Sequence, residues 1–284
     1  MKRTSKLLGA TGSFVLAMTA TPALADGTTS GTQITNTVTV NFTVGGAAQT
    51  AVQASDTFTV DRKISLTVAE VGNTTTSVSP NQLAAVTAFT VTNTSNTVLD
   101  FALAAAQQSG GAGAHSNTDN FDVTNVRIYR DATGAGAGSF GAEDTLVTSL
   151  DELAADASAT VFVVADVPIN RVTGDVAAVT LTATAREGGA AGTLGAAITQ
   201  TTGANTSGVD TVFADGAGAT DAARDGAFSA RDDYTVLAAA ITVTKSSTVI
   251  SDPFNGTTNP KAVPGAVVQY CVIIRNAAGG AVAN

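Results

Sequence analysis

Hydrophobic and polar residues alternate along much of this chain, and the alternation predicts β-strands. The clearest run covers residues 34–44, ITNTVTVNFTV, in which Val38, Val40 and Phe42 share one face and threonines and asparagine share the other. A period of two with one polar face is typical of a half-buried antiparallel strand. The glycine pair at 45–46 follows directly and predicts a tight hairpin turn.

The same alternation predicts many more short strands and no long helix. These strands cover residues 56–60, 64–68, 85–92, 98–104, 121–129, 145–150, 160–167, 176–185, 236–244 and 267–275. Short strands separated by Gly, Asn and Asp turns are typical of β-sandwiches. We therefore expect an all-β protein with an immunoglobulin-like antiparallel β-sandwich. The likeness is one of architecture only, because the chain has no tryptophan and one cysteine, and so lacks the antibody-type core.

Composition along the chain divides it into successive parts. Residues 26–61 are predicted to form an N-terminal β-hairpin segment, and residues 62–187 a complete sandwich domain. Residues 188–240 are rich in Gly, Ala and Asp and are predicted to be a linker or long loop. Residues 241–284 are predicted to be a partial second copy of the domain.

The first 25 residues predict a route out of the cytoplasm. Three basic residues (Lys2, Arg3 and Lys6) precede an apolar stretch at 7–20 and a small-residue ending, Ala-Leu-Ala, at 23–25. This order is typical of a secretory signal peptide. No later segment has the roughly 18 continuous apolar residues of a membrane helix. We expect a secreted, extracellular or cell-surface protein without a transmembrane span in the mature chain.

The charge of the chain excludes one class of partner. Removal of residues 1–25 leaves 11 basic and 23 acidic residues, which changes the net charge from −9 to −12. A chain this acidic repels the phosphates of nucleic acids, so we expect no nucleic-acid partner. The only cysteine, Cys271, lies in a predicted strand and is expected to face away from the core. We expect either that Cys271 pairs with a partner in a segment missing from this sequence or that it is a free thiol.

An internal similarity supports the prediction of a second copy. Residues 263–284 align with residues 79–100, so that Pro264 matches Pro80 and, after one inserted residue, Asn276 matches Asn93. Eight residues follow the second asparagine, whereas a full domain follows the first. The conformational entropy lost when such a segment becomes ordered exceeds the free energy gained by burying its few inward apolar side chains. We expect it to pack on the first domain, borrow strands from another chain, or remain poorly ordered.

The stretches AITVTKSSTVISDP and AVPGAVVQYCVIIRN resemble the bacterial surface repeat known as domain of unknown function eleven. The matching positions are Lys245, Pro264, Gly265, Tyr270 and Asn276. Residues 62–104 match more loosely, and the leading GTQITNTVTVNF resembles the closing strand of such a repeat. The resemblance implies an immunoglobulin-like sandwich in extracellular, often multi-repeat proteins, and it implies no catalytic residues.

One loop is a candidate calcium site. Residues 131–144, DATGAGAGSFGAED, offer the oxygen ligands Asp131, Thr133 and Asp144. Calcium takes six to eight oxygens, usually from closely spaced Asp and Asn side chains. Ala135 stands where a further side-chain ligand is needed, so the sequence favours an empty loop over a calcium loop. No other cofactor is indicated.

The remaining polar residues do not predict a catalytic site. His115, the only histidine, lies in the polar loop GGAGAHSNTDN and is expected to be solvated. A dispersed set of aspartates in the predicted linker is expected to solvate it. These are Asp210, Asp215, Asp221, Asp225, Asp232 and Asp233.

Signal peptide, repeats and the lack of catalytic motifs together favour a non-enzymatic structural or adhesive protein. Its expected partners are other copies of itself or envelope proteins. A narrower hypothesis is that one molecule completes the next by adding a strand; the alternative, which we favour, is that the sequence is a fragment or ends prematurely. The alternative is a calcium-dependent ligand-binding or adhesion module that uses the loop at 131–144 and the later aspartates.

Overall fold

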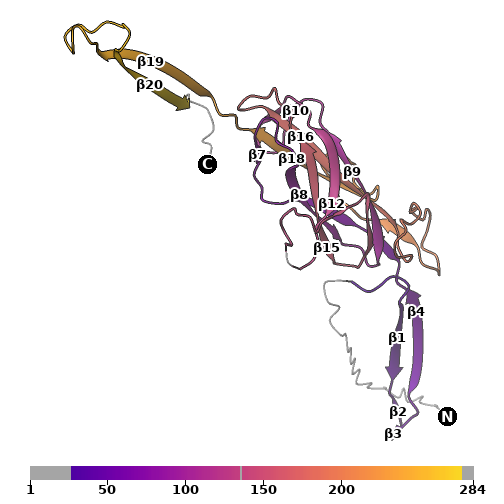
Figure 1. The fold of residues 1–284 in the computed structure, drawn as a ribbon. Helices are drawn as coiled ribbons and strands as arrows, with labels where there is room; N and C mark the ends of the chain where they lie inside the picture. The colour runs from indigo at the N-terminus through magenta and orange to yellow at the C-terminus, as the bar shows by residue number, and fades with distance from the viewer. Residues whose placement is uncertain (1–26, 135, 277–284) are drawn as a thin grey trace, which may run out of the picture.

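The computed structural model describes residues 27–134 and 136–276, and these residues contain strands and no helix. Two five-stranded sheets form a sandwich, from which one hairpin projects at each end (Figure 1). The predicted all-β, sandwich-like fold is therefore confirmed. The predicted signal peptide and residues 277–284 lie outside the described residues. No helix of the described part is long and apolar enough to cross a membrane.

The first sheet is antiparallel and has the strand order β13-β12-β15-β8-β6. Its strands are β6 (Leu66–Glu70), β8 (Ala85–Asn93), β15 (Ser158–Asp166), β12 (Thr124–Arg130) and β13 (Thr145–Leu146). Burial alternates along β8, where Ala85, Thr87, Phe89 and Val91 are buried and the residues that alternate with them are only partly covered. The period of two read from the sequence is thus the period that the fold uses.

The second sheet has the order β14-β9-β16-β18-β7, with β7 parallel to β18 and the other pairs antiparallel. Its strands are β7 (Thr76–Val78), β18 (Ala227–Val236), β16 (Val176–Glu187), β9 (Leu99–Gln107) and β14 (Ser149–Leu153). A further short parallel pair joins β5 (Arg62–Ile64) to β17 (Thr211–Phe213). A small hairpin of β10 (Gly111–Ala112) and β11 (Thr118–Asp119) lies after β9.

Aromatic rings mark the centre of the core between the two sheets. Phe89 and Phe101 come from opposite sheets and are fully buried, as is Tyr234 of β18. The Tyr234 hydroxyl donates a hydrogen bond of 2.9 Å to the backbone carbonyl of Val163 in β15. One side chain therefore fills the core and also links the two sheets.

Strand β18 lies inside the range that the sequence predicts as a linker. It pairs with β16 over nine residues, from Thr235 opposite Val176 to Ala227 opposite Thr184, and its other edge pairs with β7. The linker prediction is therefore wrong for residues 227–236, and the sandwich extends beyond residue 187 to Val236. The cause is the charged run Arg-Asp-Asp at 231–233, which hides the apolar alternation of the strand.

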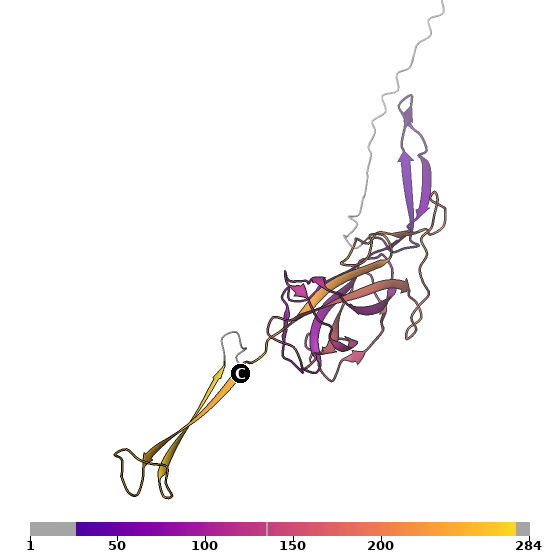
Figure 2. The same ribbon diagram turned by 90° about the horizontal axis from the view of Figure 1, so that it is seen from above.

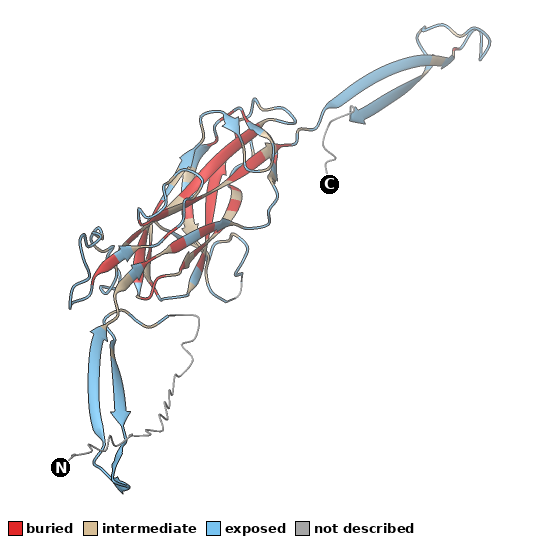
Figure 3. Cartoon of the chain, turned by 180° about the vertical axis from the view of Figure 1, so that it is seen from behind, coloured by how far each residue is buried: buried red, intermediate tan, exposed pale blue. Residues whose placement is uncertain are grey.

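The N-terminal segment is a hairpin with no core of its own. Strands β1 (Gln33–Val40) and β4 (Val52–Thr59) pair antiparallel, and β2 (Thr43–Val44) and β3 (Ala47–Ala48) extend them to the turn. Gly45 and Gly46 have φ values of 59° and 86°, the left-handed conformation that glycine adopts freely. The hairpin turn is as predicted. The predicted half-burial is wrong, because β1 and β4 are almost wholly exposed within the described part of the chain (Figure 3).

A second hairpin projects from the opposite end of the sandwich (Figure 2). It consists of β19 (Ile241–Ser251) and β20 (Val267–Asn276), and nearly all residues of both strands are exposed. These residues correspond to the predicted partial copy. Cys271 is exposed and unpaired within the described residues, in keeping with its predicted outward position.

Candidate functional site

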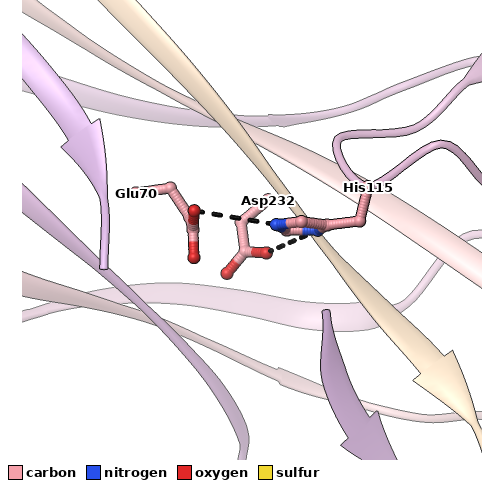
Figure 4. Close-up of side chains that lie close together, drawn as sticks. All are labelled: Glu70, His115 and Asp232. Atoms are coloured by element: carbon pink, nitrogen blue, oxygen red, sulfur yellow. Dashed lines mark ion pairs between the residues drawn. The ribbon is translucent and has the colours of Figure 1, made fainter. Parts of the chain in front are cut away.

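Three segments that are distant in sequence bring ionisable side chains together at one edge of the sandwich. Glu70 ends β6, His115 lies in the loop between β10 and β11, and Asp232 lies in β18. Their side chains point toward one another (Figure 4). We call Glu70, His115, Asp232 and the adjacent Asp233 the histidine–carboxylate cluster.

Strand alternation turns two of these carboxylates into the space between the sheets. Glu70 has the same parity as Leu66 and Val68, which are buried core residues of β6. Asp232 likewise has the same parity as Tyr234 in β18. Each strand therefore continues its inward apolar face with an acidic residue at the edge of the core.

Asp233, the next residue of β18, holds the loop that carries His115. Its Oδ2 accepts hydrogen bonds from the backbone N–H groups of Ala114, at 2.9 Å, and His115, at 3.2 Å. A Cβ on Gly113 would lie 2.0 Å from Asn117 Oδ1 and 3.0 Å from this same Asp233 oxygen. Glycine is thus needed where the loop approaches β18. The carboxylate and the glycine together place the imidazole over the cluster.

The imidazole is surrounded by carboxylates at 3.4 to 3.7 Å. His115 Nε2 lies 3.7 Å from Glu70 Oε2, and Nδ1 lies 3.7 Å from Asp232 Oδ1 and 3.4 Å from Asp233 Oδ2. Side-chain exposure is 16% for His115, 11% for Glu70, 1% for Asp232 and 0% for Asp233. The prediction that His115 is solvated is therefore wrong. The prediction that Asp232 and Asp233 are solvated linker residues is wrong as well.

Burial and neighbouring charge separate the pKa values of the two aspartates. Burial raises the pKa of Asp232 to about 7; a hydrogen bond from the Asp233 N–H and the nearby His115 oppose the rise, whereas the charges of Glu70 and Asp233 add to it. Burial also acts to raise the pKa of Asp233, but polar groups of Thr75 and Asn117 and the loop N–H groups lower it overall. Asp233 is therefore ionised at neutral pH, whereas Asp232 is partly protonated at neutral pH.

Several polar atoms of the cluster have unused bonding capacity. Glu70 Oε1, His115 Nδ1, Asn117 Oδ1 and Asp233 Oδ1 are buried and have no hydrogen-bond partner among the described residues. Buried polar atoms in native proteins are nearly always paired. Glu70, His115 and Asp232 each offer one ligand atom, and these atoms all lie within 4.8 Å of one another. Such a donor set is able to coordinate a metal ion.

The carboxylates of the predicted calcium loop accept hydrogen bonds from backbone N–H groups of the same loop. Asp131 Oδ2 accepts a hydrogen bond from the Gly138 N–H at 2.9 Å, and Asp144 accepts two, from Ala132 and Gly141, each at 2.8 Å. Thr133 is exposed. The loop is also anchored by the ring of its Phe140, which packs edge-on against Tyr129 and Phe162. Calcium binding by Asp131, Thr133 and Asp144 stays a prediction.

A second acidic group lies at the far edge of the β9 sheet and was not expected from the sequence. Asp100, Asp151 and Glu152 bring their carboxylates within 4.8 Å of one another. Asp100 accepts hydrogen bonds of 2.8 Å from the N–H groups of Glu152 and Gly195, and Asp151 accepts one of 2.9 Å from Gly192. These bonds fasten the loop that follows β16, which gives this group a structural role.

Comparison of the sequence with known protein families and with curated proteins finds no match in either. The resemblance to the bacterial surface repeat therefore stays a prediction. Function has to be argued from the hairpins, the loops and the histidine–carboxylate cluster.

Proposed function

We propose that this protein is a non-enzymatic structural or adhesive component of the bacterial cell surface, which contacts other copies of itself or envelope proteins through its two projecting hairpins. The predicted signal peptide at residues 1–25 supports a location outside the cytoplasm. The single observation that carries the proposal is that each hairpin has an apolar face that no part of the described chain covers.

The N-terminal hairpin has two chemically distinct faces. On one face, the cross-strand pairs include Val38 with Ala54 and Val40 with Val52, and both Val38 and Val40 are more than 40% exposed. On the other face, hydroxyl and amide groups bond across the strands, as between Thr35 and Thr57 at 2.8 Å. The first face resembles the inner face of a sandwich whose second layer is supplied by another molecule.

The C-terminal hairpin repeats this division. Val243 and Ile274 form a cross-strand pair and are 63% and 67% exposed, and Val272 and Tyr270 continue the same face along β20. The Lys245 ammonium lies 4.9 Å from the centre of the Tyr270 ring. A two-stranded hairpin is only marginally stable alone in water. Packing of two such faces, or addition of a strand, would stabilise both hairpins.

Light scattering of the chain without its signal peptide tests the proposal. We expect assembly that grows with protein concentration and is lost when residues 26–60 are removed. Val40→Lys should weaken the assembly because it places a charge on the apolar face. Thr37→Lys, on the polar face of the same strand, is the matched control and should assemble normally. A strict monomer in every form would exclude self-assembly, and a specific hydrolytic or transfer activity of purified protein would overturn the non-enzymatic function.

Calcium-dependent adhesion is the second candidate, and one observation favours it. Asp131 Oδ1 is buried without a hydrogen-bond partner among the described residues, so one oxygen of the loop remains available to an ion. Titration calorimetry with calcium decides between the two. Heat of binding and a rise in melting temperature, both lost in Asp131→Asn, would support it. Neither heat nor a shift in the unmodified chain would end it.

A further inference from the structure

We propose that Glu70, His115 and Asp232 bind a divalent transition-metal ion, for which Zn²⁺ is the best fit, with Asp233 as the residue that orients the histidine. The ion would connect β6 of one sheet, β18 of the other and the β10–β11 loop. This site is independent of the hairpin faces and goes beyond the proposed structural or adhesive function.

The spacing of the donor atoms is close to that of a metal site. Zinc binds nitrogen and oxygen ligands at about 2.0–2.2 Å in tetrahedral geometry, which places the ligand atoms about 3.3 Å apart. Glu70 Oε2 lies 3.7 Å from His115 Nε2, and one donor atom from each of Glu70, His115 and Asp232 lies within 4.8 Å of the others. Small rotations of these side chains would close this difference. Water supplies the fourth ligand in many three-residue zinc sites.

Asp233 is placed to orient the imidazole ring of a metal-bound His115. When one imidazole nitrogen binds a metal, the other typically donates its proton to a carboxylate, which fixes the ring. Asp233 Oδ2 lies 3.4 Å from Nδ1 and is itself fixed by two backbone N–H groups. This arrangement leaves Nε2, on the side of Glu70, for the ion. Asp233 is therefore a positioning residue rather than a ligand.

Charge and unused polar atoms both favour a cation. Three carboxylates surround one imidazole, and no lysine or arginine of the described residues forms an ion pair with any of them. Asp233 is fully buried, and three buried atoms of the cluster, Asp233 Oδ1, Glu70 Oε1 and His115 Nδ1, have no hydrogen-bond partner among the described residues. A divalent ion beside His115 Nε2 would give the Glu70 carboxylate a partner and would offset the negative charge of the cluster.

The ligand types select the metal. An imidazole nitrogen suits zinc and other first-row transition metals, whereas calcium and magnesium prefer ligands that are all oxygen. The set of one nitrogen and two carboxylates belongs to the first class. Calcium is therefore expected to bind this cluster much more weakly than zinc.

His115 is the only histidine of the chain, so its imidazole NMR signals report on the site in unmodified protein. The protein is prepared without a histidine tag or the predicted signal peptide, and titrated with Zn²⁺. We expect these signals to shift until a single equivalent is bound, with a matching rise in melting temperature. Calcium at the same concentration should leave them in place. Signals that do not move with zinc would overturn the proposal, whatever the outcome of the assembly experiment.

Calorimetry with variants assigns the ligands. His115→Ala and Glu70→Gln should abolish or strongly weaken zinc binding, and Asp233→Asn should weaken it by about 10- to 100-fold, as expected for an orienting partner. Asp151→Asn, in the other acidic group, and Cys271→Ser, at the exposed thiol, are controls that should bind zinc as the unmodified chain does. Zinc binding that survives both ligand variants, or that is lost with Cys271→Ser, would overturn the assignment.

Discussion

At the scale of single residues, Tyr234 makes the clearest contribution to the stability of the sandwich. Tyr234→Phe keeps the buried ring and removes the hydroxyl that bonds the Val163 carbonyl. We expect a loss of about 1–2 kcal/mol in the free energy of unfolding, because a buried hydrogen bond between the two sheets is removed. Urea denaturation measures the loss.

Tyr270→Phe is the matched control, because the Tyr270 side chain is exposed at 64% on the C-terminal hairpin. Its hydroxyl has water available before and after folding, so the free energy of unfolding should change by less than about 0.5 kcal/mol. Equal effects of the two substitutions would contradict the assignment of Tyr234 as a link between the sheets.

Gly195 is required by a close approach of two backbone segments. A Cβ at this position would lie 1.7 Å from the backbone carbonyl oxygen of Glu187 at the end of β16. Gly195→Ala must therefore displace the loop, and we expect it to lower the free energy of unfolding by about 1–3 kcal/mol. Gly208→Ala, where the nearest atom is Thr206 Oγ1 at 3.6 Å, is the control in denaturation experiments. A similar stability of both variants would contradict this close approach.

At the scale of elements, the sequence predicts strands well where apolar alternation is unbroken. Strand β8 and the turn at Gly45 and Gly46 are examples. Strand β18 was missed because Asp232 and Asp233 look like solvated linker residues. Asp233 is tolerated inside because the loop at Ala114 donates N–H groups from 119 residues away in sequence. No local pattern carries that information.

The histidine–carboxylate cluster was missed for the same reason. His115 alone in a glycine-rich loop gives no sign that β6 and β18 lie beneath it. A partial signal exists in Glu70, which continues the inward parity of Leu66 and Val68 and is therefore an acidic residue at a core position. The predicted burial of β1 was wrong because alternation shows only that a strand has an apolar face. It does not show whether another part of the chain covers that face.

The loop that joins β19 and β20 in the C-terminal hairpin is expected to open at low pH. Burial acts to raise the pKa of Asp252, but hydrogen bonds from Asn255, Lys261 and Phe254 outweigh it and lower the pKa from 3.8 to about 2. Because the carboxylate form makes these bonds, they stabilise the closed loop fully above pH 3.8. This contribution is lost as the pH falls toward 2.

Amide NMR of Lys261 measures the opening of this loop. We expect its N–H signal to move and to exchange faster with water between about pH 4 and pH 2, before the amides of the sandwich change. In Asp252→Asn the signal should no longer respond to pH in this range. A Lys261 amide that is constant down to pH 2 in the unmodified chain would contradict the prediction.

At the scale of the whole molecule, stability and contact surfaces lie in different parts of the chain. Within the described residues, the buried apolar side chains all belong to the sandwich, whereas the two projecting hairpins are almost wholly exposed (Figure 3). The hairpins lie at opposite ends (Figures 1 and 2), so contacts at both ends would join molecules into a row. The sandwich then acts as a spacer that sets the distance between successive contacts.

Replacement of residues 33–59 by a short glycine–serine turn tests this separation. The chain ends to be joined are already adjacent, since the Gly31 N–H donates to the Val60 carbonyl at 2.9 Å and the Val60 N–H to the Thr32 carbonyl at 2.9 Å. None of the removed residues belongs to the core. We therefore expect the urea midpoint of the sandwich to stay the same within error and concentration-dependent assembly to be lost. A large drop in the midpoint would mean that the hairpin supports the fold, and retained assembly would mean that its apolar face is not the contact surface.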